Sequence, residues 1–305
     1  MKQHLMQQLM GNGRKTSTPA LLGLILLGLA AGCSQPLPII PPPPPEPTPE
    51  GENDLVILEN SQKILFFRET FTDPETYQER WVVRNELVDQ LPGLCLDFRS
   101  SYVALDDAGF LDLQAEARNH GLACPDRLAS QVYTSQQNFG NGNYRVRLRC
   151  DPVEATICAA YLLSDTTHDE IDLIEIYTDQ NGRIWLWFVV HVGVPGKIPE
   201  ERYKITCPAT GLGIDVRDWH EYEVAWSQNS IKFYLDGRRI VPGSNRCFEE
   251  TRKTPFVPQP QPMRLRLEYR YVPWSTPPLT SGLKHAAVDW VRFAADSPPP
   301  TPPPP

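Results

Sequence analysis

The sequence predicts an all-β domain with the architecture of a β-sandwich. Alternating polar and apolar residues, the pattern of strands with one buried face, recur at 143–149, 185–190, 231–235 and 263–271. Gly, Asn, Asp and Pro separate these stretches, and Asp236-Gly237 has the composition of a two-residue hairpin turn. The sequence shows no amphipathic pattern longer than two helical turns and no internal repeat. Many short strands with such turn signals are typical of a sandwich.

An export signal is predicted ahead of this domain. Residues 1–32 carry Lys2, Arg14 and Lys15 but no acidic residue, and an apolar run spans residues 20–31. A basic start, a short apolar run and small residues before a cleavage point are typical of a secretory signal peptide. The run is too short for a membrane-spanning helix, so we expect the segment to be removed after export.

The residues around Cys33 indicate how the exported chain is held. Ala30-Ala31-Gly32-Cys33 resembles the cleavage motif of bacterial lipoproteins, although Leu29 stands four rather than the usual three residues before the cysteine. The resemblance implies that Cys33 is lipidated. Stable anchoring takes more than one acyl chain, and lipoprotein maturation on Cys33 would supply them. We therefore expect a lipid-anchored protein of the bacterial cell envelope, at the outer membrane or the cell surface. Ordinary signal cleavage nearby is the alternative.

Two proline-rich segments flank the domain. Residues 33–53 include five consecutive prolines at 41–45, and the tail at 297–305 is similar. Proline favours the extended polyproline II conformation and cannot build a core. We therefore predict a stiff linker at 33–53 and a tail without regular structure. Residues 54–296 remain, about 240 residues, which is enough for one all-β domain.

The charge balance argues against one class of partner. Without residues 1–32, 26 basic side chains face 37 acidic ones, a formal charge of −11. Nucleic acid is not expected as a partner, because its recognition needs a basic surface. A neutral polysaccharide is not disfavoured. We expect a monomer whose partners are a polysaccharide and, through Cys33, the membrane.

Six cysteines remain when Cys33 is set aside, and an even number in an exported chain predicts disulfides. Cys150 and Cys158 flank a predicted hairpin and are the favoured pair, although six cysteines allow fifteen connectivities. A zinc site is the alternative, but no C-x₂-C or H-x₃-H spacing supports it. The six are Cys95, Cys124, Cys150, Cys158, Cys207 and Cys247.

Three acidic residues lie within one strand-like run, Glu170-Ile171-Asp172-Leu173-Ile174-Glu175. Successive side chains of a regular strand point to opposite faces. Glu170 and Asp172 would therefore share a face, and Glu175 would point the other way. One extra residue, a β-bulge, would bring Glu175 round to the same face. The sequence therefore predicts a bulged strand that presents all three carboxyl groups together.

Such a cluster is costly unless it serves chemistry, because neighbouring carboxyl groups repel one another and cannot all ionise normally. A retaining glycosidase needs this arrangement. One carboxylate attacks the anomeric carbon, and a second, protonated carboxyl about 5–5.5 Å away donates to the leaving oxygen. The third acid can share a proton with the other two. The alternatives are a solvated acidic strand face and a calcium site.

The six-residue run resembles the E-x-D-x-x-E signature of family 16 glycoside hydrolases, in the laminarinase-like branch with a bulged catalytic strand. Other stretches fall in the order that this family shows, so the resemblance extends from about residue 64 to residue 294. These stretches are residues 66–71, 109–115, 133–147, 219–237 and 287–293.

This resemblance implies the concanavalin A-like fold, a β-jelly-roll sandwich of two curved antiparallel sheets with a carbohydrate cleft. It implies that Glu170 is the nucleophile, Asp172 the assisting acid and Glu175 the acid/base. The implied activity is that of a retaining, endo-acting glycoside hydrolase or transglycosylase. The enzyme would cleave a β-1,3- or β-1,4-linked glucan or galactan by double displacement. No cofactor or catalytic metal is expected, although Asp289 and Glu69 fit a structural calcium site that some members carry.

Three stretches depart from the family pattern. Many members carry Trp-Pro-Ala-x-Trp-Leu before the catalytic strand, where this chain has Ile157-Cys158-Ala159-Ala160-Tyr161-Leu162, so both tryptophan positions are changed. Glu268 stands where a later strand often carries Asn, as a fourth acid that would shift the pKa of its neighbours. Thr167-His168-Asp169 lacks the usual Gly. These changes concern the substrate subsites and leave the three acids intact.

Four residues are predicted to bind substrate. Trp187 and Trp274 are candidate rings for sugar stacking, and Glu268 lies on a strand that faces the catalytic acids. His191 follows Glu175 by sixteen residues, where members of the family often carry a cleft histidine. The alternative for the two rings and for His191 is a place in the core.

A second function is open on the same fold. The chain could be a non-catalytic carbohydrate-binding surface lipoprotein, an interpretation that the changed tryptophan positions favour. The intact acids favour the enzyme, and a fold by itself decides neither.

Overall fold

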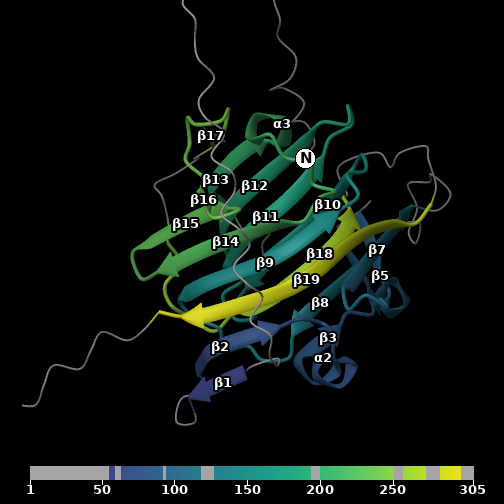
Figure 1. The fold of residues 1–305 in the computed structure, drawn as a ribbon, viewed down its shortest axis with the longest axis vertical. Coiled ribbons are helices and arrows are strands. Elements are labelled where there is room, and N and C mark those ends of the chain that lie inside the picture. The colour runs from purple at the N-terminus through teal and green to yellow at the C-terminus, as the bar shows by residue number, and fades with distance from the viewer. Residues whose placement is uncertain are drawn as a thin grey trace, which may run out of the picture. The chain divides into compact units, whose positions relative to one another are not determined.

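Two β-sheets packed face to face form the domain, which confirms the predicted antiparallel sandwich (Figure 1). The computed structural model describes residues 55–58, 63–91, 94–117, 127–193, 200–250, 257–272 and 282–296. All of them lie in the unit Pro45–Pro305. The signal peptide, Cys33, the linker and the tail lie outside the described residues and stay predictions. None of the described helices is long and apolar enough to cross a membrane.

The first sheet, which we call the β11 sheet, carries the acidic motif on a central strand. Its strands follow in the order β3-β8-β18-β10-β11-β12-β13-β17, each antiparallel to the next. Their bounds are β3 Trp81–Val83, β8 Arg127–Thr134, β10 Thr156–Leu163, β11 Glu170–Thr178, β12 Ile184–Val192, β13 Glu200–Pro208, β17 Phe248–Glu249 and β18 Arg264–Tyr271.

The second sheet, the β19 sheet, forms the opposite layer, in the order β16-β15-β14-β9-β19. The outer edge of β19 is shared, because β2 pairs with its C-terminal half and β7 with its N-terminal half. β1 and β6 extend these two branches. The bounds are β1 Leu55–Leu58, β2 Lys63–Glu69, β6 Val103–Leu105, β7 Leu111–Ala117, β9 Gly142–Cys150, β14 His220–Ser227, β15 Ser230–Leu235, β16 Arg238–Arg239 and β19 Lys284–Ala295.

Few described elements lie outside the two sheets. β4 (Glu86–Leu91) and β5 (Leu94–Phe98) form a hairpin, and β5 runs parallel to β8. The helices are α2 (Pro74–Arg80), α3 (Ala209–Leu212) and the 3-10 turn η1 (Ser100–Tyr102). α2 begins where the side chain of Asp73 accepts a hydrogen bond from the backbone N–H of Glu75, with proline at the first helical position. All are short, as the sequence predicts.

The core lies between the sheets and takes one face of each strand. Ile171, Leu173 and Ile176 of β11 are buried in it. Phe188 of β12 and Phe233 of β15 join the layers, with ring centroids 5.5 Å apart. Each buried side chain of this size stabilises the fold by about 1.5–3 kcal/mol. This packing holds β11 in the middle of its sheet, with its polar side chains on the face away from the core.

The predicted hairpin turn at Asp236-Gly237 is confirmed. Leu235 at the end of β15 pairs with Arg238 at the start of β16. Asp236 has φ 49° and Gly237 has φ 71°, so both adopt the left-handed conformation. Positive φ at both central residues defines the two-residue turn whose twist suits a hairpin.

The favoured disulfide prediction is wrong. Cys150 and Cys158 are free, buried thiols. The chain between them is no hairpin, because it crosses from β9 in the β19 sheet to β10 in the β11 sheet. The two thiols meet inside the core, where hydrogen bonding with Cys158 and burial raise the pKa of Cys150 well above its usual value.

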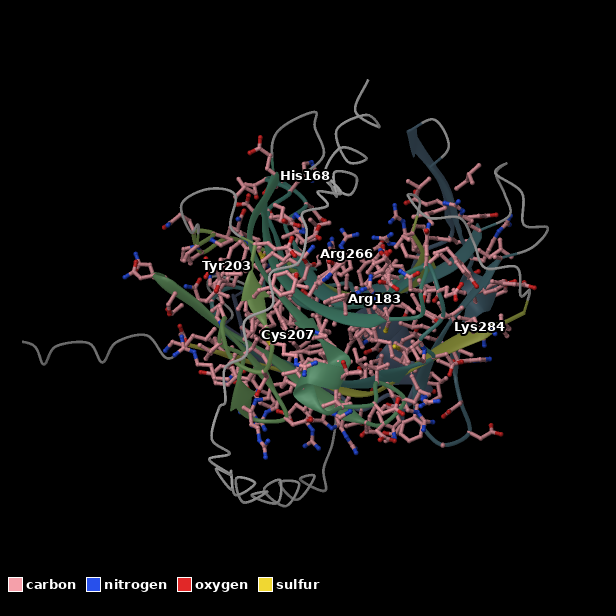
Figure 2. All side chains as sticks on the ribbon, turned by 90° about the horizontal axis from the view of Figure 1, so that it is seen from above. His168, Arg183, Tyr203, Cys207, Arg266 and Lys284 are labelled. Carbon is pink, nitrogen blue, oxygen red and sulfur yellow. A yellow bond between two sulfur atoms is a disulfide. The ribbon has the colours of Figure 1, made fainter. Side chains whose placement is uncertain are left out.

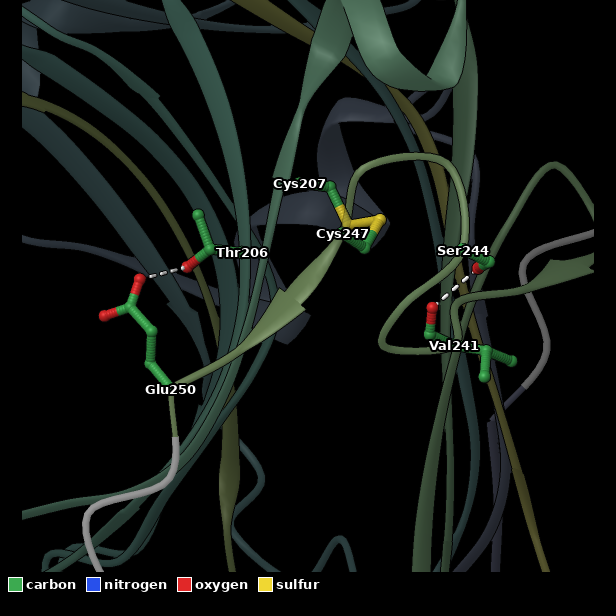
Figure 3. The surroundings of a disulfide bond; sticks show 6 residues. All are labelled: Thr206, Cys207, Val241, Ser244, Cys247 and Glu250. Carbon is green, nitrogen blue, oxygen red and sulfur yellow. Dashed lines mark hydrogen bonds between the residues drawn. A yellow bond between two sulfur atoms is a disulfide. The ribbon is translucent and has the colours of Figure 1, made fainter.

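A disulfide joins Cys207 to Cys247 instead and fastens β13 to the segment before β17 (Figure 3). Thr206 and Glu250 add a hydrogen bond of 3.0 Å between the same two stretches. The side chain of Cys95 and all of Cys124 lie outside the described part of the chain, so their pairing stays open.

We expect the double substitution Cys207→Ala/Cys247→Ala to lower the free energy of unfolding by about 4 kcal/mol, the chain-entropy value for a loop of this length. Denaturant unfolding followed by fluorescence measures the loss. A reducing agent should lower the stability of the wild type more than that of the double variant. A wild type whose stability is insensitive to reduction would contradict the cross-link.

Candidate active site

The acidic motif occupies β11, and this strand contains the predicted bulge. Asp172 pairs with Val189 of β12, and Glu175 pairs with Trp187, so two residues of β11 stand opposite a single residue of β12. The register with β10 shifts at the same place. In a regular strand the side chain of Glu175 would point to the opposite face from Glu170 and Asp172. The extra residue of the bulge turns Glu175 to the face that Glu170 and Asp172 occupy.

Burial is uneven along the bulged strand. Leu173 and Ile174, the residues inside the bulge, are fully buried. The side chain of Glu170 is 23 % exposed, whereas that of Asp172 is 1 % exposed. The charges of Glu170 and Glu175 both act on Asp172. The middle acid is thus the one removed from water, and the expected 5–5.5 Å between the outer two carboxyl groups stays a prediction.

Rows of side chains cross the outer face of the β11 sheet, because directly paired residues of neighbouring strands point to the same face. The rows through Asp172 and Glu175 bring these two catalytic candidates together with residues from distant parts of the sequence. The Asp172 row consists of Tyr133, Arg266, Tyr161, Asp172, Val189 and Lys204, from β8 to β13. The Glu175 row consists of Gln131, Glu268, Ala159, Glu175, Trp187, Thr206 and Phe248, from β8 to β17.

His191 supplies a positive charge directly beside the acids. Its Nε2 lies 3.2 Å from Oδ2 of Asp172 and 3.9 Å from Oε1 of Glu170. Burial alone lowers the pKa of His191, but hydrogen bonding to Asp172 and the charges of Asp172, Glu170 and Glu175 outweigh burial and raise this pKa to about 10. His191 therefore contacts the acids as an imidazolium at neutral pH, and its predicted contact with substrate stays a prediction.

Two of the acids, Asp172 and Glu175, hold protons more tightly than isolated carboxyl groups do. Burial raises the pKa of Asp172 well above its usual value, and the charges of Glu170 and Glu175 raise it further, against the lowering effect of His191. Burial also raises the pKa of Glu175, which His191 and Arg270 lower. A carboxyl group that keeps its proton near neutral pH can act as a general acid.

Glu268, the fourth acid, is fully engaged. It forms an ion pair with Arg270, two residues along β18. Tyr161 donates a hydrogen bond to its Oε2 at 2.9 Å, and Gln131 donates another to the same oxygen. Arg270 in turn lowers the pKa of Glu175. The structure thus places a cation next to Glu175 together with the fourth acid, and the predicted role of Glu268 in substrate binding stays a prediction.

Trp187 lies beside Glu175, directly across the pair of strands β11 and β12. Its ring stacks on Tyr177 with centroids 4.6 Å apart, and Nζ of Lys204 lies 3.7 Å from the ring centroid. The ring is therefore contacted from both neighbouring strands, and a sugar that stacks on it must displace one contact. Trp274, the other predicted ring, lies outside the described residues.

The two positions at which many family members carry tryptophan, 157 and 161, lie in different surroundings in this chain. Ile157 is fully buried. Tyr161 stands in the Asp172 row, where its hydroxyl donates to Glu268 and accepts a hydrogen bond of 2.8 Å from Gln131. Burial and the charge of Glu268 raise the pKa of Tyr161 well above its usual value. A hydrogen-bonded phenol thus replaces the open tryptophan ring that many family members carry.

The stretch Thr167-His168-Asp169, which lacks the usual glycine, directly precedes β11. His168 has φ 60°, a left-handed conformation that costs a residue other than glycine about 1–2 kcal/mol. Asp169 fixes this turn, because its Oδ1 accepts from the backbone N–H of Gly193 at 2.9 Å and its Oδ2 from Nε2 of Gln261 at 2.6 Å. Asp169 therefore ties the start of β11 to the end of β12, next to Glu170.

One group of the described residues could hold a metal ion, since ligand atoms of Glu170, Asp172 and His191 lie within 4.8 Å of one another. The positive charge of His191 beside Asp172 and Glu170 already accounts for the grouping. Of the predicted calcium ligands, Asp289 is ion-paired with an arginine of β9. Glu69 is fully buried and accepts a hydrogen bond of 2.9 Å from a backbone N–H. The calcium site stays a prediction.

The sequence model of the Glycosyl hydrolases family 16 matches residues 104–292, which include the whole acidic motif. The chain belongs to this family. It is accordingly a glycoside hydrolase, an enzyme that acts on glycosidic bonds. A search of curated protein sequences finds no significant match.

Solved structures share the fold of this chain at low sequence identity. The β-glucanase of Bacillus licheniformis is 19% identical, with 76% of this chain and 98% of that chain covered and a TM-score of 0.56. The laminarinase catalytic domain of Thermotoga maritima is 15% identical, with 80% and 100% covered and a TM-score of 0.54. Rv0315 of Mycobacterium tuberculosis, titled a pseudo β-1,3-glucanase, is 22% identical, with 76% and 99% covered and a TM-score of 0.54.

Several side chains of the site were not predicted from the sequence. Lys204 and Gln131 come from β13 and β8, and no local pattern reveals the register that brings them into the rows. The sequence contains the signal needed to predict Arg270. This residue stands two positions after Glu268 in an alternating run and is therefore on the same face.

The raised pKa of His191 has a measurable consequence for stability. A protonated histidine that gains partners on folding contributes its full stabilisation below the unfolded pKa of about 6.5, and the contribution is lost as pH rises through about 10. We expect His191→Gln to be about 2 kcal/mol less stable than the wild type at pH 6, because a buried charge loses its partner. Denaturant unfolding should show this difference shrinking toward pH 10. An unchanged difference across that range would contradict the assignment.

Proposed function

We propose that the domain is a retaining, endo-acting glycoside hydrolase or transglycosylase that works by double displacement. The bulge in β11 carries the proposal, since it places Glu170, Asp172 and Glu175 on one face. In retaining enzymes one carboxyl group is the nucleophile and a second, a short distance away, is the acid/base. The proposed substrate is a β-1,3- or β-1,4-linked glucan or galactan, in keeping with the β-glucanase and laminarinase of similar fold.

In the first step, the carboxylate of Glu170 attacks the anomeric carbon. Glu175, whose pKa burial raises, gives its proton to the glycosidic oxygen as the bond to that oxygen breaks. The products are a glycosyl ester of Glu170 and the released sugar alcohol. In the second step, Glu175 takes a proton from water, or from a sugar hydroxyl, whose oxygen displaces Glu170. Water gives hydrolysis, and a sugar gives transglycosylation.

The charge pattern of the site suits both steps. The negative charge of Glu170 is one of the causes that raise the pKa of Glu175. Esterification removes that charge, so the pKa of Glu175 falls just when this residue must act as a base. Asp172 and His191 keep a proton and a positive charge beside the ester carbonyl. The same groups thus support Glu170 as an attacking and as a leaving group.

A non-catalytic carbohydrate-binding protein is the alternative. The loss of the open ring at position 161 favours it, as does the pseudo β-1,3-glucanase among the structures of similar fold. Both proposals predict carbohydrate binding, so only product formation separates them.

Activity of acid variants tests the enzyme proposal. Glu170→Gln should abolish turnover, and Glu175→Ala should slow natural polymers by about 10²–10⁴-fold, because general acid–base catalysis contributes this much. An activated aryl glycoside, which needs little protonation, should suffer less with Glu175→Ala, and azide should restore turnover. The matched control is Glu79→Gln on the exposed face of α2, which should keep full activity.

Reducing-end release from laminarin, lichenan, agarose, carrageenan and xyloglucan, measured across pH, gives the readout. The wild type should show a bell-shaped profile whose basic limb reports the raised pKa of Glu175. Binding without products from the whole panel at every pH would establish the alternative, and a Glu170→Gln variant that retains most activity would overturn the mechanism.

We also propose that the chain is exported and held at the bacterial cell envelope by lipid on Cys33. The signal-like residues 1–32 and the proline-rich residues 33–53 support this. A fatty-acid analogue fed to expressing cells should label the wild type and the matched control Ser34→Ala. Cys33→Ser should lose the label and leave the membrane fraction. Label retained by Cys33→Ser would contradict lipidation at this residue.

A further inference from the structure

A group of arginines lies on the outer face of the β11 sheet, on the β18 side of the catalytic strand. Arg264 and Arg266 alternate along β18, and Arg84 follows β3; we call these three residues the arginine cluster. Nη1 of Arg84 and Nη1 of Arg266 both donate to Oε1 of Gln131, at 3.1 and 3.4 Å. Guanidinium groups from β18 and from the segment after β3 therefore meet at one neutral oxygen. Figure 2 labels Arg266 near the middle of the domain.

The arginine cluster carries more positive charge than its carboxylate partners balance. Arg264 and Arg266 share one carboxylate, that of Asp165, at 2.6 and 2.9 Å. Arg84 pairs with Glu86. Three guanidinium groups thus have two carboxylates, although the whole chain has a formal net charge of −8. A local excess of positive charge on an acidic protein attracts an anion to that place.

The carboxylate of Asp165 satisfies only some of the hydrogen-bond donors of the arginine cluster. It gives one oxygen to Arg266 and the other to Arg264, so it does not bind both arms of either guanidinium. Nε of Arg266 is left buried, with no acceptor among the described residues. The side chain of Asp165 is 38 % exposed and can leave the cluster. The guanidinium fork fits the paired oxygens of a carboxylate or a sulfate, which would satisfy both arms of Arg266 together.

The arginine cluster is placed to contact the same polysaccharide as the acids. Arg266 belongs to the Asp172 row and is separated from Asp172 by Tyr161 alone. Two strand spacings are about 10 Å, a distance that a short run of sugar units spans. The ring of Tyr133 lies against both arginines of β18, 5.1 Å from Arg266 and 5.6 Å from Arg264. These contacts hold the guanidinium groups in place.

We propose that the arginine cluster is a subsite for an anionic substituent, a carboxylate or a sulfate ester, on a sugar unit near the bond that is cleaved. The inference rests on the proposed function and narrows its substrate class to acidic β-linked polysaccharides. The substituent replaces the carboxylate of Asp165 on Arg266. Asp165 is therefore an internal competitor that occupies the subsite until substrate arrives.

Matched pairs of polymers test this subsite. One pair is a sulfated galactan and the same galactan after desulfation, and the other is a β-1,3-glucan and its C6-oxidised form, whose units carry carboxylates. Calorimetry with the Glu170→Gln variant measures binding without turnover. We expect the charged member of one pair to bind at least about ten-fold more tightly at low salt. The preference should fall as ionic strength rises, because salt screens exposed charges.

Two substitutions, each added to Glu170→Gln, change the preference in opposite directions. Arg266→Gln should remove most of it, because the fork is lost. Asp165→Asn should increase it, because the internal competitor is lost while the arginines remain. Arg292→Gln is the matched control, since Arg292 lies on β19 in the opposite sheet, and it should leave binding unchanged.

The outcomes separate the subsite from the catalytic proposal. A preference for the sulfated or for the oxidised polymer supports the subsite and identifies the substituent. Equal binding within both pairs overturns it, as does a preference that survives Arg266→Gln or disappears with Asp165→Asn. If Arg266→Gln fails to fold, the salt dependence and Asp165→Asn decide. Products from neutral polymers without any charge preference remove only the subsite, and a charge preference without any products removes only the hydrolase.

Discussion

Repulsion among three carboxyl groups on one strand face is the constraint around which the centre of the β11 sheet is built. A regular strand would relieve it by turning Glu175 to the other side, and the bulge prevents this. The compensating cations come from both sides of β11: His191 on β12, Lys204 on β13 and Arg270 on β18. Each must be held in a precise register, so the apolar face of the same sheet, packed on the β19 sheet, is what keeps the charges in position.

The sequence predicts those parts of the structure that depend on local rules. Parity along six residues is enough to predict the bulge, and the Asp236-Gly237 pair is enough to predict its turn. The arrangement of Cys150 and Cys158 could not be predicted by such a rule. A short connection between two strands looks like a hairpin in the sequence, both when the chain returns to the same sheet and when it crosses to the other sheet. Only the pairing of β9 and β10 with their separate neighbours decides between these arrangements.

Contacts between distant segments account for the rest. Gln131 reaches Glu268 across 137 positions of sequence, and no periodicity in either segment specifies the register that brings them together. The resemblance to family 16 predicts where the acids lie, since their motif is intact. It does not predict what surrounds them, because Tyr161 and Glu268 depart from the family pattern and bind each other in this chain. The family motif therefore specifies the chemistry, and its departures define the surroundings.

The edge of the β11 sheet shows a further property of this architecture. β17 is only two residues long, yet it pairs with Ile205 and Thr206 and so occupies the backbone groups that β13 would otherwise present to solvent. The Cys207–Cys247 disulfide holds this short cover in place (Figure 3). An uncovered edge strand is a template for strand addition by another molecule. The cross-link therefore opposes strand addition at Ile205 and Thr206 as well as unfolding.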